Sequence, residues 1–370
     1  MRRHFRPKKR IEEEETMTEK RNMTKEDVFL EARIRSEGVR IEVINKPATW
    51  DLFRSIVMDG CELVVGLWEN PYSRLEAIID GDHVIISDMG EALGTATLQR
   101  RPSWRNELLS DGTTVQNAIP WNPDIASIFL QYQCTTALSA NACKYCAVSA
   151  LPDGAMLPSM PPGAFEAMKA RSVEAITIAL QNGWRGTILF TGGTPPRSRK
   201  DYGQVTDDME RVMTQFRESI DDEILSQIHF SEALFSPPDD LGLLEKWRDI
   251  GLNSTEFDSQ VMDPDYFKAI CPGRGDQRRW IEAQAASAEV FGRGLGATTA
   301  VVMGIEPMAG LVEGVEERIK RGVFTQVLTF VPAPGTPYGG FGRRRLHGSW
   351  RPVRKSPTST CATQTHSTSI

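Results

Sequence analysis

The stretch Cys134-Thr-Thr-Ala-Leu-Ser-Ala-Asn-Ala-Cys143-Lys-Tyr-Cys146 directly follows the apolar run 125–130 and places three cysteines within 13 residues. Thiolates are the usual ligands of iron–sulfur clusters, and three of them leave one iron open for a further ligand. No histidine lies between His83 and His229 to complete a zinc site nearby in sequence. The stretch therefore favours a cluster with one open iron.

Other uses of these cysteines remain open. Disulfides need an oxidising compartment, and the N-terminus lacks the apolar segment of a secretory signal. A structural zinc site could recruit Cys271 or a distant histidine. Cys143 and Cys146 could also form a redox-active pair.

The spacing Cys-x8-Cys-x2-Cys resembles the cysteine loop of the radical S-adenosylmethionine (SAM) superfamily, in which Cys-x3-Cys-x2-Cys is usual. The longer first interval adds well under about 1 kcal/mol of closure entropy, because that cost grows only logarithmically with loop length. The second interval matches, with an aromatic residue before the last cysteine. The resemblance implies that Cys134, Cys143 and Cys146 bind a [4Fe-4S] cluster, with SAM on the unique iron and Tyr145 beside the cofactor.

Composition limits the classes of function. The chain has 370 residues, 40% of them hydrophobic, and a net charge of -6 from 43 basic and 49 acidic residues. This balance argues against a chain-wide dependence on nucleic acid or an anionic membrane. No apolar run is long enough to span a bilayer, so we expect no membrane partner and a cytoplasmic location, where thiols stay reduced.

The chain divides into four predicted parts. Residues 1–25 alternate basic and acidic clusters and are expected to be disordered, whereas 26–115 read as a small, strand-rich α+β N-terminal subdomain. Within it, Asp80-Gly81-Asp82 separates two apolar runs, which predicts a hairpin. Residues 120–340 form the main domain. Residues 341–370 are basic and Ser/Thr-rich, which predicts a disordered tail and suggests a truncated or shifted reading frame.

Strand-like and helix-like segments alternate in the main domain, which is typical of a parallel sheet with crossover helices. This pattern resembles the partial (β/α)6 TIM-like barrel of the radical SAM superfamily. Functional groups are then expected at the carboxyl ends of the strands. Strands are predicted near 125–132, 187–191, 227–234, 253–258, 298–304 and 325–331, and helices near 163–182, 203–219, 238–250, 277–292 and 309–321.

A second group of segments resembles the SAM-binding parts of the family. Thr191-Gly192-Gly193-Thr194-Pro195 is similar to the Gly-Gly-Glu-Pro segment whose backbone contacts the amino group of SAM. The resemblance implies this backbone role for Gly192, Gly193 and Thr194, but no carboxylate role, since threonine stands where glutamate is usual. A plain turn between strand and loop would also favour these residues.

Further candidates come from two later segments. Asn253-Ser-Thr-Glu256-Phe-Asp258 resembles the family strand that meets the ribose or methionyl end of SAM, which implies a contact for Glu256. The segment 271–280 resembles the biotin-synthase-like branch of the superfamily, and Arg274 and Arg278 there could bind a carboxylate in bidentate fashion. An ordinary strand and a solvated helix start explain these residues equally well. Gly304 and Glu306 match the adenine-side strand more loosely.

The resemblance implies an enzyme that cleaves SAM reductively to a 5′-deoxyadenosyl radical and takes hydrogen from a small-molecule substrate that the sequence does not identify. It also implies a low-potential electron donor such as ferredoxin or flavodoxin, and no nucleic-acid partner. No residue is assigned to catalysis. The alternative is a noncatalytic scaffold that binds zinc or a metabolite.

Overall fold

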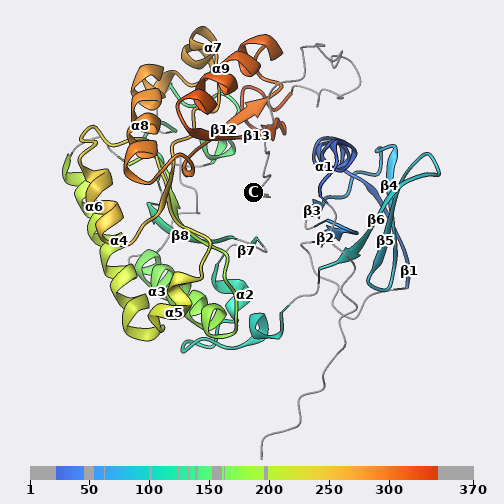
Figure 1. Ribbon diagram of the computed structural model, residues 1–370, viewed down its shortest axis with the longest axis horizontal. Coiled ribbons are helices and arrows are strands. Elements are labelled where there is room, and N and C mark those ends of the chain that lie inside the picture. The colour runs from blue at the N-terminus through green and yellow to red at the C-terminus, as the bar shows by residue number, and fades with distance from the viewer. Residues whose placement is uncertain are drawn as a thin grey trace, which may run out of the picture. The chain divides into compact units, whose positions relative to one another are not determined.

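A computed structural model describes residues 22–45, 54–61, 63–99, 102–119, 121–122, 125–131, 133–137, 141–151, 161, 163–195 and 199–340. Contacts divide the chain into two compact units (Figure 1). The first runs to Ile34 and continues over 39–99, and the second comprises 35–38 and everything from Arg100 onward.

The first unit is a six-stranded sheet with one helix. The helix α1 (Lys25–Glu37) precedes β1 (Arg40–Asn45), β2 (Arg54–Met58), β3 (Val64–Leu67), β4 (Leu75–Asp80), β5 (His83–Asp88) and β6 (Glu91–Leu98). The sheet order is β1-β4-β5-β6-β2-β3.

Alternation along β4 explains how this unit forms its core. Leu75, Ala77 and Ile79 are fully buried and share a hydrophobic cluster with Leu30 and Ile34 of α1, because every second strand residue points to the same face. The antiparallel pairing of β4 with β5 confirms the hairpin predicted at Asp80-Gly81-Asp82. Its turn uses the left-handed backbone of Gly81, with φ of 60°.

The second unit contains a seven-stranded sheet in the order β13-β12-β11-β10-β9-β8-β7. Its strands are β7 (Trp121–Asn122), β8 (Ile125–Gln131), β9 (Thr187–Gly192), β10 (Ser231–Leu234), β11 (Ser254–Glu256), β12 (Gly294–Met303) and β13 (Val323–Thr329). The strands from β8 to β13 pair in parallel with their sequence neighbours, and β7 runs antiparallel to β8.

Helix α2 (Val115–Ala118) precedes β7, and the other helices connect successive parallel strands. They are α3 (Ala164–Gln181), α4 (Arg199–Ser219), α5 (Asp222–Ser226), α6 (Leu243–Asp249), α7 (Pro264–Ile270), α8 (Gln277–Val290) and α9 (Met308–Lys320). In Figure 1 the helices α3, α4, α6 and α8 lie on the outside of a curved array of strands. The unit thus has a mixed α/β fold with a half-barrel sheet.

The two faces of strands β10, β11 and β12 differ in chemistry. Thr255 and Thr299 are fully buried on the face that α8 covers, and the Thr255 hydroxyl donates to Ser287 of that helix at 2.7 Å. We call this the helix-covered face. The opposite face carries Glu232, Ser254, Glu256 and Thr298, whose side chains meet across the strands; we call it the inner face.

The six predicted strands of this unit are all present, with shifts at their ends. The strand expected from 227 begins only at Ser231. A short helix, α5, with Asp221 at its N-cap, ends at Ser226, and residues 227–230 connect it to the strand. The strand expected from 298 already begins at Gly294. The five predicted helices are also present, and α6 is shorter than expected, from Leu243 to Asp249.

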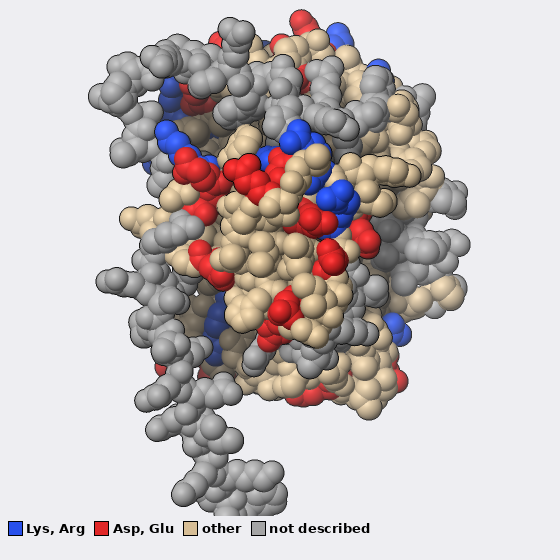
Figure 2. Space-filling view, turned by 90° about the vertical axis from the view of Figure 1, so that its right-hand side faces the viewer, with Lys and Arg blue, Asp and Glu red and all other residues tan. Residues whose placement is uncertain are grey.

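Some predictions fall outside the described residues. Those for the tail at 341–370 and for residues 1–21 are among them, whereas α1 begins at Lys25. No helix in the described part of the chain is both long and apolar enough to cross a membrane. On the face that Figure 2 presents, Asp and Glu side chains are interspersed with Lys and Arg, and uncharged surface separates them. The expected absence of a nucleic-acid partner stays a prediction.

Candidate cofactor site

The cysteine loop, residues 134–146, begins three positions after β8 ends at Gln131. Its first part is fixed to the segment that follows the neighbouring strand β9. The backbone N–H and the hydroxyl of Thr135 both donate to the carbonyl of Thr194, at 3.0 and 2.9 Å. Because β8 and β9 are parallel, the two segments leave the sheet at the same edge. The site therefore lies at the carboxyl ends of the strands, as expected for this fold.

Cys134 is held by hydroxyl and backbone groups. Its Sγ lies 3.0 Å from Oγ1 of Thr136, and Thr194 also donates to it. Burial raises the pKa of Cys134, but the hydrogen bonds from Thr136 and Thr194 outweigh burial and leave it lowered. Thr194, at the position where the family usually has glutamate, thus contacts a candidate cluster ligand.

The paired glycines after β9 are needed for close backbone approach. The N–H of Gly193 donates to the carbonyl of Gln131 at 3.0 Å. A Cβ on Gly193 would overlap the carbonyl of Gln133 and the backbone nitrogen of Cys134, and one on Gly192 would overlap Gln131. The glycines therefore let the two loops pack together. A contact of their backbone with SAM stays a prediction.

The second part of the cysteine loop is fixed to a different region. The N–H of Lys144 donates to the carbonyl of Ile270 at the end of α7, at 3.0 Å. The carbonyl of Lys144 accepts from the N–H of Tyr338 at 3.1 Å. The N–H of Gly273 donates to the carbonyl of Asn141 at 2.8 Å. Cys143 and Cys146 are thus positioned by segments far away in the sequence.

Cys143 is the most acidic of the three loop thiols. A hydrogen bond from Cys271 lowers the pKa of Cys143 to about 6, helped by the Arg274 guanidinium and opposed by burial. The same hydrogen bond, with burial, raises the pKa of Cys271. Cys143 is therefore a thiolate at neutral pH while Cys271 keeps its proton. Sequence reasoning had left Cys271 open as a free buried cysteine, an extra ligand or a hydrogen-atom donor.

The charges of the three loop thiols act on one another. Burial raises the pKa of Cys146, and the nearby charges of Cys143 and Cys134 raise it further. Three thiolates in one loop repel each other, and cationic iron offsets that repulsion, so this donor set fits an iron–sulfur cluster. Among the described residues, no three His, Cys, Asp or Glu side chains are grouped so that they would hold a single metal ion.

The two candidate arginines have different environments. Arg274 donates to the backbone carbonyl of Asp258, and its guanidinium lies 4.5 Å from the ring centroid of Trp280. Burial acts to lower the pKa of Arg274, but anionic neighbours, with Cys143 first, raise it overall. Arg278 instead forms an ion pair with Asp276 at 2.7 Å and is 82% exposed. No contact within the described residues joins Arg278 to the cysteine loop.

Three carboxyl groups gather on the inner face. The Oε1 atom of Glu232 accepts from the hydroxyls of Ser254 at 2.9 Å and Thr298 at 3.1 Å. Burial raises the pKa of Glu232 to about 7, despite these hydrogen bonds. Burial also raises the pKa of Glu256 and Asp258, and the charge of Asp258 raises that of Glu256 further. Burial therefore favours the protonated forms of the acids on the inner face, and a ligand that offers donors or positive charge would oppose that shift.

Glu232 was not predicted as a site residue. The available signal was an acidic residue within Ser231-Glu232-Ala233-Leu234, in a strand type that is normally apolar throughout because both faces are covered. Gln260 was also missed. Its side chain accepts from the Tyr145 hydroxyl at 2.9 Å and donates to Asp258 at 2.8 Å.

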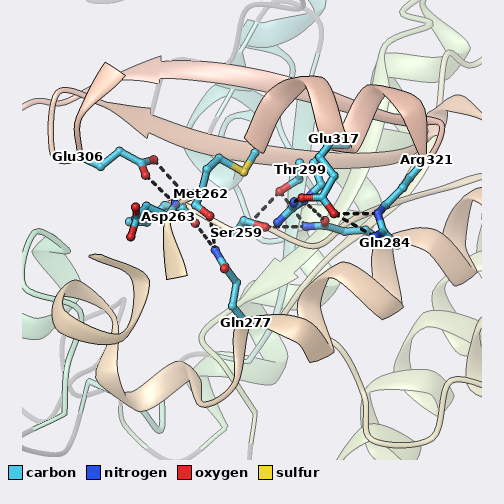
Figure 3. A network of polar contacts seen from close by, with 11 residues as sticks. Ser259, Met262, Asp263, Gln277, Gln284, Thr299, Glu306, Glu317 and Arg321 are labelled. Carbon is cyan, nitrogen blue, oxygen red and sulfur yellow. Dashed lines mark hydrogen bonds and ion pairs between the residues drawn. The ribbon is translucent and has the colours of Figure 1, made fainter. Parts of the chain in front are cut away.

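Glu306 serves the backbone of the segment after β11. Its carboxylate oxygens accept from the N–H groups of Met262 and Asp263, both at 2.8 Å (Figure 3). These contacts give Glu306 a structural role. Gly304 has φ of 106°, which explains glycine there by backbone conformation. An adenine contact for either residue stays a prediction.

A half-barrel of parallel strands with a three-cysteine loop after its first parallel strand, β8, is the arrangement that the resemblance to the radical SAM superfamily implies. The chain is 41% identical over 327 residues to the bacteriochlorophyllide c C-7(1)-hydroxylase of Chlorobaculum limnaeum, and the match covers 86% of this chain and 81% of that protein. The chain belongs to the family of this hydroxylase, and it is an enzyme. No family model matches it.

Solved structures show weaker similarity. A methylornithine synthase has a TM-score of 0.40 at 14% identity, covering 60% of this chain and 57% of its own. The FeFe-hydrogenase maturase HydG from Carboxydothermus hydrogenoformans has a TM-score of 0.41 at 14% identity, covering 60% and 49%. Coproporphyrinogen III oxidase from Escherichia coli, described as a radical SAM enzyme, has a TM-score of 0.37 at 11% identity, covering 65% and 51%.

Proposed function

We propose that this chain is a radical SAM hydroxylase that acts on the C-7(1) position of bacteriochlorophyllide c or a closely related pigment. Cys134, Cys143 and Cys146 hold a [4Fe-4S] cluster, and SAM binds its unique iron over a (β/α)6 partial barrel. The observation that carries the proposal is the cysteine loop, which lies at the carboxyl end of β8 and is fixed there by β9 and α7. The substrate follows from the 41% identical hydroxylase.

The protein's own groups have distinct tasks in this proposal. The lowered pKa of Cys143 makes it a ready ligand without prior deprotonation. Arg274 is a half-buried cation whose charge acts on Cys143, and it is the candidate partner of the SAM carboxylate, since its guanidinium can bind a carboxylate in bidentate fashion. Glu256 and Asp258 supply acceptors on the inner face. Gly192, Gly193 and Thr194 offer backbone groups beside Cys134.

When bound, the cluster and SAM would supply a 5′-deoxyadenosyl radical that takes a hydrogen atom from the substrate. Hydroxylation would further require a one-electron acceptor for the second electron and a water molecule that supplies the hydroxyl oxygen and releases a proton. The residues around the site orient SAM and the substrate. A low-potential donor such as ferredoxin or flavodoxin provides the electron. The cytoplasmic location and the absence of nucleic-acid and membrane partners remain predictions.

The test is anaerobic reconstitution with iron and sulfide. We expect about four irons per chain, an EPR signal of the reduced cluster that changes when SAM is added, and 5′-deoxyadenosine whose yield rises with bacteriochlorophyllide c. Replacement of Cys134, Cys143 or Cys146 by alanine should remove most of the iron. Full retention of iron in all three variants would refute the ligand assignment.

Cys271→Ala is the matched control, because Cys271 is buried beside Cys143 but lies outside the loop. It should keep the iron. If Cys271→Ala loses as much iron as the loop variants, Cys271 is a fourth ligand and no iron is open for SAM. Stoichiometric zinc, with no 5′-deoxyadenosine, would instead support the noncatalytic scaffold.

A further inference from the structure

Gln260 has an unusual backbone. Its φ is 66°, and among the described residues only Met89 shares a positive φ without being glycine. A left-handed conformation costs a residue with a Cβ on the order of 1 kcal/mol, so it persists where the surroundings require it. The N–H of Gln260 donates to Ala300, and its carbonyl accepts from Val302, both at 2.8 Å. The segment after β11 thereby stays paired in parallel with β12 at Gln260 and Val301.

The neighbours of Gln260 are fixed from the helix-covered face. Gln284 of α8 donates to the carbonyl of Phe257 at 2.6 Å and to Ser259 Oγ at 2.9 Å (Figure 3). Gln277 donates to the carbonyls of Val261 at 2.8 Å and Met262 at 2.9 Å. These bonds hold the backbone on both sides of Gln260, and none of them uses its side chain.

The side chain of Gln260 joins two other groups. Its Oε1 accepts from the Tyr145 hydroxyl at 2.9 Å, and its Nε2 donates to Oδ2 of Asp258 at 2.8 Å. Oδ1 of Asp258 accepts from the N–H of Ala300 at 2.7 Å. A side-chain amide is suited to this place because one planar group carries both a donor and an acceptor.

These contacts connect the cysteine loop to the inner face. Tyr145 stands between Lys144 and Cys146 in the loop, and the backbone carbonyl of Asp258 accepts from Arg274. The sheet thus brings together, at the carboxyl ends of its strands, segments that carry four side chains: Tyr145, Asp258, Gln260 and Arg274. A strained residue whose side chain bridges two parts of a cofactor site indicates a functional requirement, because glycine would adopt the same backbone freely.

We propose that Gln260 is a positioning residue for SAM binding: its amide fixes Tyr145 of the cysteine loop against Asp258 of the inner face. This inference rests on the proposed function. Gln260 itself need not touch SAM. Its effect acts through the placement of the phenol and the carboxylate, and the strained backbone is retained because it aims the amide between them.

The test compares Gln260→Gly with Met89→Gly. Both changes relieve a left-handed backbone, and Met89 lies in the turn between β5 and β6 of the first unit. Both variants should keep the iron content. Met89→Gly should melt at or slightly above the wild-type temperature, whereas Gln260→Gly should melt somewhat below it, because the Tyr145 hydroxyl and the Asp258 carboxyl lose a partner. Only Gln260→Gly should weaken SAM binding, by about tenfold, measured by titration of the reconstituted protein and by the EPR response to SAM.

Gln260→Glu refines the test. It keeps an acceptor for Tyr145, but it loses the donor to Asp258 and adds a like charge, so SAM binding should weaken at least as much as in Gln260→Gly. Wild-type SAM affinity in either variant would overturn the inference. Lost iron in Gln260→Gly would also overturn it and make the residue structural. If the wild-type protein itself binds no iron or SAM, the proposed function fails, and this inference with it.

Discussion

The two faces of strands β10, β11 and β12 differ in how their polar side chains interact. On the helix-covered face, the amide of Gln284 donates to Phe257, Ser259 and Thr299 and accepts from Arg318 at 3.1 Å (Figure 3). On the inner face, acids meet other acids, and burial raises the pKa of all three.

The difference separates stability from binding. Paired polar groups cost little to bury, and they fix the segments that carry the site. Acids whose buried charges repel one another are costly to ionise, and a ligand that offers donors or positive charge offsets that cost. Substitutions on the helix-covered face should therefore change folding, and those on the inner face should change binding and pH dependence.

The largest expected effect on stability is that of Gln284→Leu. The change removes the partner of the Phe257 carbonyl and of the Nε of Arg318, a residue that is only 1% exposed. Leaving buried polar groups unsatisfied costs about 1–3 kcal/mol each, so we expect a loss of about 3 kcal/mol in the free energy of unfolding, measured in urea. Glu289→Leu, at an exposed position of the same helix, should change it by less than about 0.5 kcal/mol. Equal effects of the two variants would break the comparison of faces.

A smaller loss of unfolding free energy is expected for Gly193→Ala, directly after β9 at the carboxyl ends of the strands. The new Cβ would overlap the backbone of Gln133 and Cys134, so the two loops must separate. Overpacking of this kind costs about 1–3 kcal/mol, and the displaced Cys134 should lower the iron content as well. Gly203→Ala in α4 is the control, because a Cβ there meets nothing within 4 Å. It should stabilise the helix by up to about 1 kcal/mol. A Gly193→Ala variant with full iron and unchanged stability would contradict the close packing of the loops.

The effect of Glu232→Gln depends on pH, and it is the smallest of the three below about pH 4.5. Burial raises the pKa of Glu232 from its ordinary value of 4.5 to about 7, so the folded protein binds this proton more tightly than the unfolded chain. That contribution to stability is complete below about pH 4.5 and is lost as the pH rises through 7.

Glutamine stays neutral and keeps an oxygen that can accept from Ser254 and Thr298. The variant should therefore gain on the wild type as the pH rises, by about 3 kcal/mol at pH 8, measured as unfolding free energy across pH 4 to 8. Glu313→Gln, at an exposed position in α9, should follow the wild-type profile. A constant difference between Glu232→Gln and wild type at all pH values would mean that Glu232 is not the titrating group.

Local patterns were enough to place most elements of the second unit. Apolar runs separated by amphipathic stretches predicted six strands and five helices that the structure contains. The errors lie at element ends. The strand predicted from 227 begins only at Ser231, after the short helix α5, which periodicity alone does not reveal. Contacts across long sequence intervals were beyond reach, such as the hydrogen bond from Tyr145 to Gln260 between residues 115 positions apart.

The sequence by itself determined the three thiols, their place after a buried strand, and the glycine pair at the end of the next strand. These features are local, because loop spacing and backbone freedom depend on neighbouring residues. Only the tertiary structure decided that Cys271 and Arg274 act on Cys143, that Glu232 joins Glu256 and Asp258, and that Gln260 links the cysteine loop to them. Hydrogen bonds and charge effects of this kind depend on distances in space, and the parallel sheet sets those distances by aligning strands that are far apart in the chain.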